Sequence, residues 1–168
     1  MRNHLFDKST IIEGRVWLIY KDNIDTRLIY PQQYHRVDDF YEMGQFTFKE
    51  FEGYENFAQQ ALPGDIIITG KNFGCGTFYQ HTIDCFISLG VQSIIAKSFC
   101  ESYENKAIHA GFPVITYETL DDIRLEHGDR IRVNFIKGMI INLRNNRVTR
   151  VNSFTEKQMN IYLQGGVF

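Results

Sequence analysis

Three glycines and a cysteine form a tight turn in the middle of the chain, within the stretch "IIITGKNFGCGTFYQH". Gly70, Gly74 and Gly76 allow backbone conformations with positive φ, and they let a ligand approach with no Cβ in the way. A helical pattern begins after Gly76, and the first-turn N–H groups of a helix, at its positive dipole end, attract anions. The turn is therefore a candidate site for a small carboxylate or phosphate.

Three other interpretations of this turn stay open on the residues alone. A dinucleotide site needs G-x-G-x-x-G, but no third glycine follows Gly76, and the Lys-Ser/Thr pair of a P-loop is absent. A thiol enzyme would use Cys75 as nucleophile with His81 or His109 as base, because a helix N-terminus lowers the pKa of a cysteine. Finally, the glycines can simply make a tight connection between a strand and a helix.

The elements that must position this turn alternate between strands and helices. The string "LPGDIIITG" predicts a turn and then a strand covered on both faces. A helix that ends at Gly90 is predicted next, because residues at helical spacing place apolar and small side chains on one of its faces. These residues are Phe78, Thr82, Cys85, Phe86 and Leu89. A strand, a helix and a strand follow at 91–99, 101–111 and 112–119. This alternation predicts parallel strands joined by right-handed crossovers, so the middle of the chain should be α/β.

Two β-rich parts flank this unit. An aromatic and β-branched run at 15–20 predicts an early strand, and "GDRIRVNFIKGMIINLRNNRVTRV" predicts three late strands separated by short turns. Residues 35–60 carry many aromatic side chains without a sustained period, so short helical turns are expected there. Because this segment is long for a connection, we expect it to be a mobile substrate loop.

Composition limits the classes of function. A chain of 168 residues with 43% hydrophobic and 23% charged residues predicts one globular domain over residues 1–168. The net charge of −2 offers no basic field for nucleic acid, and the late arginines alternate with apolar residues as solvated strand faces do. No apolar run is long enough to span a bilayer. Three cysteines without paired spacing predict free thiols, no metal site on this chain and a cytoplasmic location.

Several of these motifs occur together in one known family. The string "GKNFGCGTFYQH" lies between "DNIDTRLIYPQQY" upstream and "IIAKSF" and "AIHAGFPVI" downstream, and the chain ends in "LQGGVF". In this order and spacing the motifs resemble the small subunits of 3-isopropylmalate dehydratase, the swivel domain of the aconitase superfamily. The resemblance covers nearly the whole chain, and it implies a single swivelling β/β/α domain.

The resemblance also implies a chemistry and a partner. Relatives of this kind work with a large subunit that carries a [4Fe-4S] cluster on its own cysteines, so no cofactor is expected on this chain. Together the two subunits remove and re-add water on small hydroxy-di- or tricarboxylic acids. The resemblance places the residue that abstracts the carbon-bound proton at Thr77. It places the substrate carboxylate at the turn formed by Gly74, Cys75 and Gly76.

Several positions depart from the family pattern. Relatives usually read G-C-G-S-S-R-E-H, with a serine as base and an arginine that grips a carboxylate. Here Thr77 replaces that serine and Tyr79 replaces that arginine, while His81 is kept. The usual D-T-D motif is Asp25-Thr26-Arg27 in this chain. Because a guanidinium binds carboxylates with two parallel hydrogen bonds, Arg27 is a candidate replacement for the missing arginine.

Arg36, in the string "YHRV", stands where relatives distinguish their substrates. It favours an acidic or polar tail on the substrate, and a solvated loop arginine is the alternative. The sequence thus predicts a hydro-lyase small subunit, inactive alone, with Thr77 as catalytic base and substrate contacts from Asp25, Thr26, Arg27, Arg36, Gly74, Cys75, Gly76, Tyr79 and His81. The opposing hypothesis is a non-catalytic subunit of the same fold that binds a small anion or scaffolds a partner protein. Without a partner, the chain could form homo-oligomers.

Overall fold

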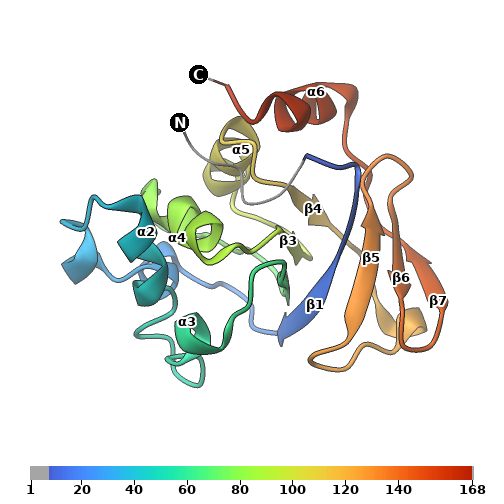
Figure 1. Ribbon diagram of the computed structural model, residues 1–168, viewed down its shortest axis with the longest axis horizontal. Helices are drawn as coiled ribbons and strands as arrows, with labels where there is room; N and C mark the ends of the chain where they lie inside the picture. Colours follow the sequence, from blue (N-terminus) through green and yellow to red (C-terminus); the bar gives the residue numbers. More distant parts are fainter. Residues whose placement is uncertain (1–7, 168) are drawn as a thin grey trace.

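One mixed sheet of seven strands organises the chain (Figure 1), in a computed structural model that describes residues 8–167. The strand order is β4-β3-β2-β1-β5-β6-β7. Strands β1 to β4 run parallel and span Ile11–Ile19, Ile66–Thr69, Ser93–Ala96 and Val114–Thr116. Strands β5 to β7 continue antiparallel from β1 and span Arg130–Asn134, Met139–Asn142 and Arg147–Arg150. The predicted parallel middle and the three late strands are confirmed.

The early strand is longer than its apolar run. It begins at Ile11 rather than Arg15, because residues 11–15 pair with β5 on the side away from β2. Ile11 lies opposite Asn134 and Arg15 lies opposite Arg130 in this pairing. The first half of β1 therefore belongs to the antiparallel part of the sheet, and the second half, which pairs with β2, belongs to the parallel part.

Three longer helices accompany the sheet. Helix α4 (His81–Leu89) connects β2 to β3, and α5 (Glu101–His109) connects β3 to β4. Figure 1 shows α4 and the short helices α2 (Phe40–Met43) and α3 (Phe57–Gln60) to the left of β1, while β5 to β7 lie to its right. A helix near the C-terminus, α6 (Glu156–Gln164), is absent from the predicted elements, although Thr155 and Gln158 form the capping box that marks its start. No helix within residues 8–167 is both long and apolar enough to cross a bilayer.

Helix α4 starts later than its side-chain spacing suggests. The helix was expected directly after Gly76, but residues 77–80 form a turn and the helix begins at His81. The carbonyl of Thr77 accepts a hydrogen bond from the hydroxyl of Thr26, 2.7 Å away, which holds the chain outside helical geometry. The end of the helix agrees with the prediction, since Gly90 terminates it with φ of 80°.

Two apolar cores lie on the two faces of the sheet. Successive residues of β2 point to opposite faces, so Ile67 packs in one core while Ile66 and Ile68 pack in the other. The first core includes the stripe of α4, with Cys85 and Phe86 fully buried. The second is covered by β5, β6 and Tyr162 of α6. The prediction of a strand buried on both faces is confirmed.

The aromatic segment 35–60 packs partly into the first core. It forms the predicted short helical turns, α2 (Phe40–Met43), η2 (Gly44–Phe46) and α3 (Phe57–Gln60). Phe48 is fully buried and forms edge-on contacts with Phe57 and Phe86, with ring centroids 5.0 and 5.5 Å apart. The predicted mobility of this segment stays a prediction.

A buried carboxylate closes the turn before β2. Asp65, which is 1% exposed, accepts hydrogen bonds from Arg15 Nη2 at 2.7 Å, Trp17 Nε1 at 2.8 Å and the Leu62 N–H at 2.8 Å. We expect Asp65→Ala to lower the free energy of unfolding by about 2–4 kcal/mol, because the buried Trp17 indole N–H and the part-buried donors of Arg15 and Leu62 lose their acceptor. Urea denaturation of the purified chain measures this loss.

A surface ion pair supplies the control. Glu13 and Arg132 are bridged at 2.6 Å but remain 41% and 45% exposed in their side chains. Glu13→Ala should therefore cost less than about 1 kcal/mol. Equal losses in the two variants would contradict the role given to Asp65.

Candidate functional site

The backbone segments that follow β1 and β2 run side by side beyond the sheet. The Gly70 N–H donates to the Lys21 carbonyl at 3.2 Å, and the Gly74 N–H donates to the Ile24 carbonyl at 2.9 Å. The pairing ends where the Thr26 N–H donates to the Cys75 carbonyl at 2.8 Å. Two motifs that lie about fifty residues apart in the sequence, "DTR" and "GCG", thus meet as one structure.

Two asparagines brace this extension. Asn23 and Asn72 both have positive φ, 57° and 55°, and the Asn72 side-chain amide donates to the Asn23 side-chain oxygen at 2.8 Å. The Asn72 N–H also donates to the hydroxyl of Ser98, which follows β3, at 2.9 Å. The ends of three parallel strands are therefore tied together beneath the glycine turn. Asparagine tolerates positive φ better than most residues, which is the signal that the sequence offers for this brace.

The glycine turn exposes backbone donors. Gly74 and Gly76 have φ of 81° and 94°, and a Cβ on Gly76 would lie 2.8 Å from Asp25 Oδ2. Within residues 8–167, the N–H groups of Gly76, Thr77 and Phe78 donate to no other residue. Such consecutive unpaired N–H groups form a concave anion site. In α4 the N–H groups of Thr82, Ile83 and Asp84 donate to the carbonyls of Tyr79 and Gln80, so the turn before the helix is the candidate anion site.

Asp25 and Arg27 form an ion pair beside this turn. Asp25 caps the short helix α1 (Thr26–Ile29) by accepting from the Arg27 N–H at 2.8 Å, and its carboxylate also accepts from Arg27 Nε at 3.0 Å. The guanidinium is 72% exposed in its side chain and the carboxylate is 25% exposed. Two of the donor nitrogens of Arg27 thus point to Asp25, and Nη1 makes no hydrogen bond within residues 8–167.

Arg27 lowers the pKa of the Asp25 carboxyl. Partial burial acts to raise the pKa of the Asp25 carboxyl, but the hydrogen bonds and charge of Arg27 together outweigh burial and lower that pKa. Because the folded-state pKa lies below the unfolded-state pKa, the interaction stabilises the fold above the ordinary carboxyl pKa. This contribution is lost as the pH falls through the folded-state pKa of Asp25.

We expect Arg27→Gln to raise the pKa of the Asp25 carboxyl, because burial then acts with less opposition. NMR titration of the side-chain carbonyl carbon measures the change directly. Arg36→Gln is the matched control, since Arg36 is exposed and makes no ion pair within residues 8–167. An unchanged pKa in the Arg27 variant would show that another group keeps Asp25 ionised.

Cys75 lies in this turn but not in a setting that activates a thiol. Burial and the charge of Asp25 raise the pKa of its thiol. No hydrogen bond joins Cys75 to a histidine within residues 8–167, and His81 instead contacts the carbonyl of Val37. These features remove the support for a cysteine nucleophile. Cys85 and Cys100 are likewise free thiols, Cys85 fully buried and Cys100 partly exposed.

The remaining predicted residues gather at the other end of α1. His35, which the sequence analysis leaves unassigned, brings them together: its ring lies 4.2 Å from the ring of Tyr79 and 5.3 Å from that of His81, between centroids. Arg36 is the next residue and is exposed. The structure thus forms two groups, one around Asp25 to Thr77 and one around Tyr79 and His81. Within residues 8–167, no hydrogen bond or ion pair joins Arg36 to the glycine turn. No sequence signal distinguishes His35 from a loop residue.

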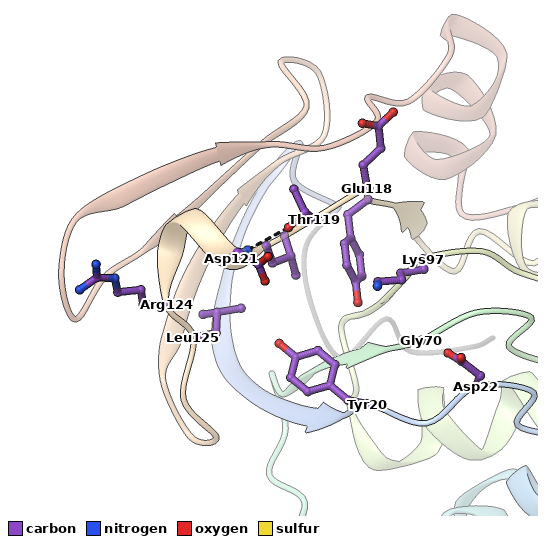
Figure 2. Close-up of a pocket in the computed structure, with 11 residues that line it drawn as sticks. Tyr20, Asp22, Gly70, Lys97, Glu118, Thr119, Asp121, Arg124 and Leu125 are labelled. Atoms are coloured by element: carbon purple, nitrogen blue, oxygen red, sulfur yellow. Dashed lines mark hydrogen bonds between the residues drawn. The ribbon is translucent and has the colours of Figure 1, made fainter.

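A cavity of about 820 Å³ opens at the same edge of the sheet. Its lining includes the residue that follows each parallel strand, namely Tyr20, Gly70, Lys97 and Tyr117. Figure 2 shows Tyr20 and Lys97 pointing into this space, while Glu118 extends away from it. Asp22 joins the cavity to the glycine turn, because its carboxylate accepts from the Lys71 N–H at 2.7 Å. None of the predicted site residues lines the cavity, so it flanks the turn without containing it.

Comparison with known proteins shows which family this chain belongs to. Residues 7–119 match the Aconitase C-terminal domain family. The chain is 37% identical over 155 residues to the 3-isopropylmalate dehydratase small subunit of Aquifex aeolicus (strain VF5), covering 92% of this chain and 90% of that protein. It is 34% identical over 158 residues to the isopropylmalate/citramalate isomerase small subunit of Methanocaldococcus jannaschii, covering 94% and 92%.

The fold agrees with these relationships. The crystal structure of the 3-isopropylmalate dehydratase LeuD protein from Methanocaldococcus jannaschii matches with a TM-score of 0.84 at 29% identity, covering 94% of this chain and 90% of that one. The predicted α/β swivel-domain class is therefore confirmed. By sequence and by fold, the chain belongs to the family of 3-isopropylmalate dehydratase small subunits, within the aconitase superfamily.

Proposed function

We propose that this chain, together with a large subunit that carries a [4Fe-4S] cluster, moves water on a small hydroxy-dicarboxylic acid and is inactive alone. The observation that carries the proposal is the glycine turn, where the exposed Thr77 adjoins unpaired N–H groups and the Asp25–Arg27 pair. Relatives named for isopropylmalate and citramalate support this substrate class. A cytoplasmic location fits three free thiols.

The side chains that the structure describes, in residues 8–167, do not fit an iron–sulfur cluster. Within residues 8–167 no three His, Cys, Asp or Glu side chains gather closely enough to hold a metal ion. Burial raises the pKa of the Cys85 thiol to about 12, whereas cluster ligands are thiolates. We therefore assign the cluster to the large subunit, and the exposed rim of the glycine turn to the side of this chain that faces it.

In this proposal Thr77 acts as an alkoxide, which accepts the proton that leaves the substrate carbon and thereby becomes the neutral hydroxyl. Its carbonyl is held by the Thr26 hydroxyl at 2.7 Å, which fixes the backbone from which the Thr77 hydroxyl projects. The neighbouring N–H groups bind a substrate carboxylate and favour negative charge next to the hydroxyl oxygen. Thr26 is then a support for the base rather than a direct contact with the substrate.

Arg27 supplies the cation that Tyr79 does not. Its Nε and Nη2 atoms bond to Asp25, so the guanidinium is oriented while Nη1 and one N–H of Nη2 stay available for a carboxylate. Asp25 has the opposite effect on affinity, because its charge offsets part of the attraction. We infer that Arg27 binds the carboxylate that relatives bind with the arginine at position 79, and that Arg36 acts on the distinguishing group of the substrate.

Reconstitution of the two-subunit complex tests the proposal. The chain is co-expressed anaerobically with the large subunit from the same source, and the complex is mixed with a panel of hydroxy diacids and unsaturated diacids while NMR follows hydration and dehydration. We expect turnover of at least one diacid by the complex and none by this chain alone. A stable, cluster-loaded complex that turns over no member of a broad panel would overturn the proposal.

A non-catalytic subunit remains the second candidate function. Two observations favour it: Tyr79 packs against His35 with ring centroids 4.2 Å apart, and the charge of Arg27 is paired with Asp25. A scaffold of this kind would still bind a small anion at the glycine turn. Chemical-shift changes at Gly76 and Thr77 on addition of a dicarboxylate, without turnover by the complex, would favour this function.

A further inference from the structure

His81 is embedded in a stack of rings rather than open to a ligand. Its imidazole lies against the buried ring of Tyr30, with centroids 5.1 Å apart and planes 29° apart. In the same stack, the His81 imidazole also lies against the ring of His35, with centroids 5.3 Å apart and planes 14° apart. Tyr30 ends α1 and His81 begins α4, so the stack joins the two helices that flank the glycine turn.

Within residues 8–167, the one hydrogen bond of the His81 side chain goes to the backbone of the segment 34–37. Nε2 of His81 lies 2.9 Å from the Val37 carbonyl oxygen. A carbonyl only accepts, so Nε2 carries the hydrogen and donates it. The same segment is closed by the Val37 N–H, which donates to the Tyr34 carbonyl at 3.0 Å. The turn is therefore bonded within itself through the Val37 N–H, and His81 bonds it to α4 through the Val37 carbonyl.

His35 ties the middle of this turn to the same place. Its ring contacts Tyr79 and His81, and its Nε2 is buried with no hydrogen-bond partner within residues 8–167. Burial, and after it the charge interaction with His81, lower the pKa of the His35 imidazole. The turn 34–37 is thus fixed at two points, His35 and Val37, which lie on either side of Arg36.

We propose that His81 is a positioning residue, which latches the turn 34–37 onto the first turn of α4 and thereby places Arg36 for substrate recognition. The latch itself stands on the contacts above, and the role of Arg36 rests on the proposed function. Because the Nε2 donor of His81 is already used, His81 acts on the substrate through the turn and not by touching it. Loss of the latch should therefore weaken substrate binding more than it slows the chemical step.

Amide hydrogen exchange of the full chain tests the latch without any assay of activity. In His81→Phe the ring remains but the donor is lost. We expect the amides of His35 and Val37, which are bonded to the Gln32 and Tyr34 carbonyls, to exchange at least tenfold faster. The Glu104 amide in α5 should not change. In His81→Gln the side-chain amide can again donate to Val37, so protection should return, and long-range ¹⁵N–¹H NMR of the wild type should show the Nε2–H tautomer.

A second imidazole provides the control for a general loss of stability. His127 is exposed, lies 4.9 Å from the Trp17 ring and accepts from the Leu18 N–H, far from the turn in the sequence. His127→Phe should leave the exchange of the His35 and Val37 amides unchanged. Unchanged exchange in His81→Phe would overturn the latch, as would equal acceleration in both variants.

Kinetics of the reconstituted complex test the consequence for Arg36. In His81→Phe we expect the KM for the turned-over diacid to rise at least fivefold with kcat within a factor of two of the wild type. In His81→Gln the KM should return toward the wild-type value. Faster exchange with an unchanged KM would overturn the placement of Arg36. Faster exchange with no turnover even by the wild-type complex would support the latch and overturn the proposed function alone.

Discussion

Thr77→Val is expected to lower kcat of the reconstituted two-subunit complex by at least about 100-fold, the usual range for loss of a proton-transfer group. Valine has nearly the shape of threonine but no hydroxyl, so proton abstraction loses its acceptor while packing is preserved. The turn itself should persist, because the bond from the Thr26 hydroxyl goes to the Thr77 carbonyl and not to its side chain. Turnover followed by NMR, with circular dichroism to verify folding, makes the measurement.

Thr77→Ser is the matched variant for this prediction. It keeps the hydroxyl that the proposed mechanism needs and restores the residue that the family usually has at this position. We expect its kcat to stay within about tenfold of the wild type, since only a methyl group is lost. Full activity in Thr77→Val would assign proton abstraction to another group, either on this chain or on the large subunit.

Gly74→Ala is expected to lower the free energy of unfolding by about 2–5 kcal/mol, combining the strain of positive φ with overpacking. A Cβ at this position would lie 2.3 Å from Cγ of Tyr103, which is fully buried. That ring cannot easily withdraw, because its hydroxyl donates to the Thr82 carbonyl at 2.7 Å and its faces contact the rings of the first core. Urea denaturation of the purified chain measures the loss.

Gly53 separates the two causes of this loss. Its φ of 87° resembles the 81° of Gly74, but a Cβ at Gly53 would meet no atom within 4 Å. Gly53→Ala should therefore show only the backbone strain, about 1–2 kcal/mol. If the two variants lost the same stability, the contact between Gly74 and Tyr103 would not matter for the fold. The glycine at position 74 would then be explained by the close approach of a ligand to the backbone.

Patterns that depend on neighbouring residues could be predicted from the sequence. The continuous apolar run of β2 and the stripe on α4 that ends at Gly90 come from local periodicity, which reports which faces are buried. The order of the motifs around "GCG" was enough to predict the family, which the comparisons confirm. The residues assigned to the site remain proposals, because motif position gives a residue's place in the chain and not its partners.

Other features depend on contacts between residues far apart in the sequence. His81 contacts the Val37 carbonyl, 44 residues earlier in the chain, although the resemblance indicated a substrate contact for this residue. The aromatic residues of 35–60 have no period, yet Phe48 and Phe57 are buried, because the core that receives them is built by α4 and β1.

The sequence by itself determined the strands and the helices between the parallel strands, the glycine turn and the family, since each follows from local side-chain patterns and from motif spacing. The tertiary structure alone decided where α4 begins, which N–H groups within residues 8–167 stay unpaired and what bonds the turn 34–37 to α4. These depend on individual hydrogen bonds such as Thr26 to Thr77 and His81 to Val37, which join segments about fifty residues apart. Hydrogen bonds of this kind form only when the sheet has brought the segments together, so no local pattern encodes them.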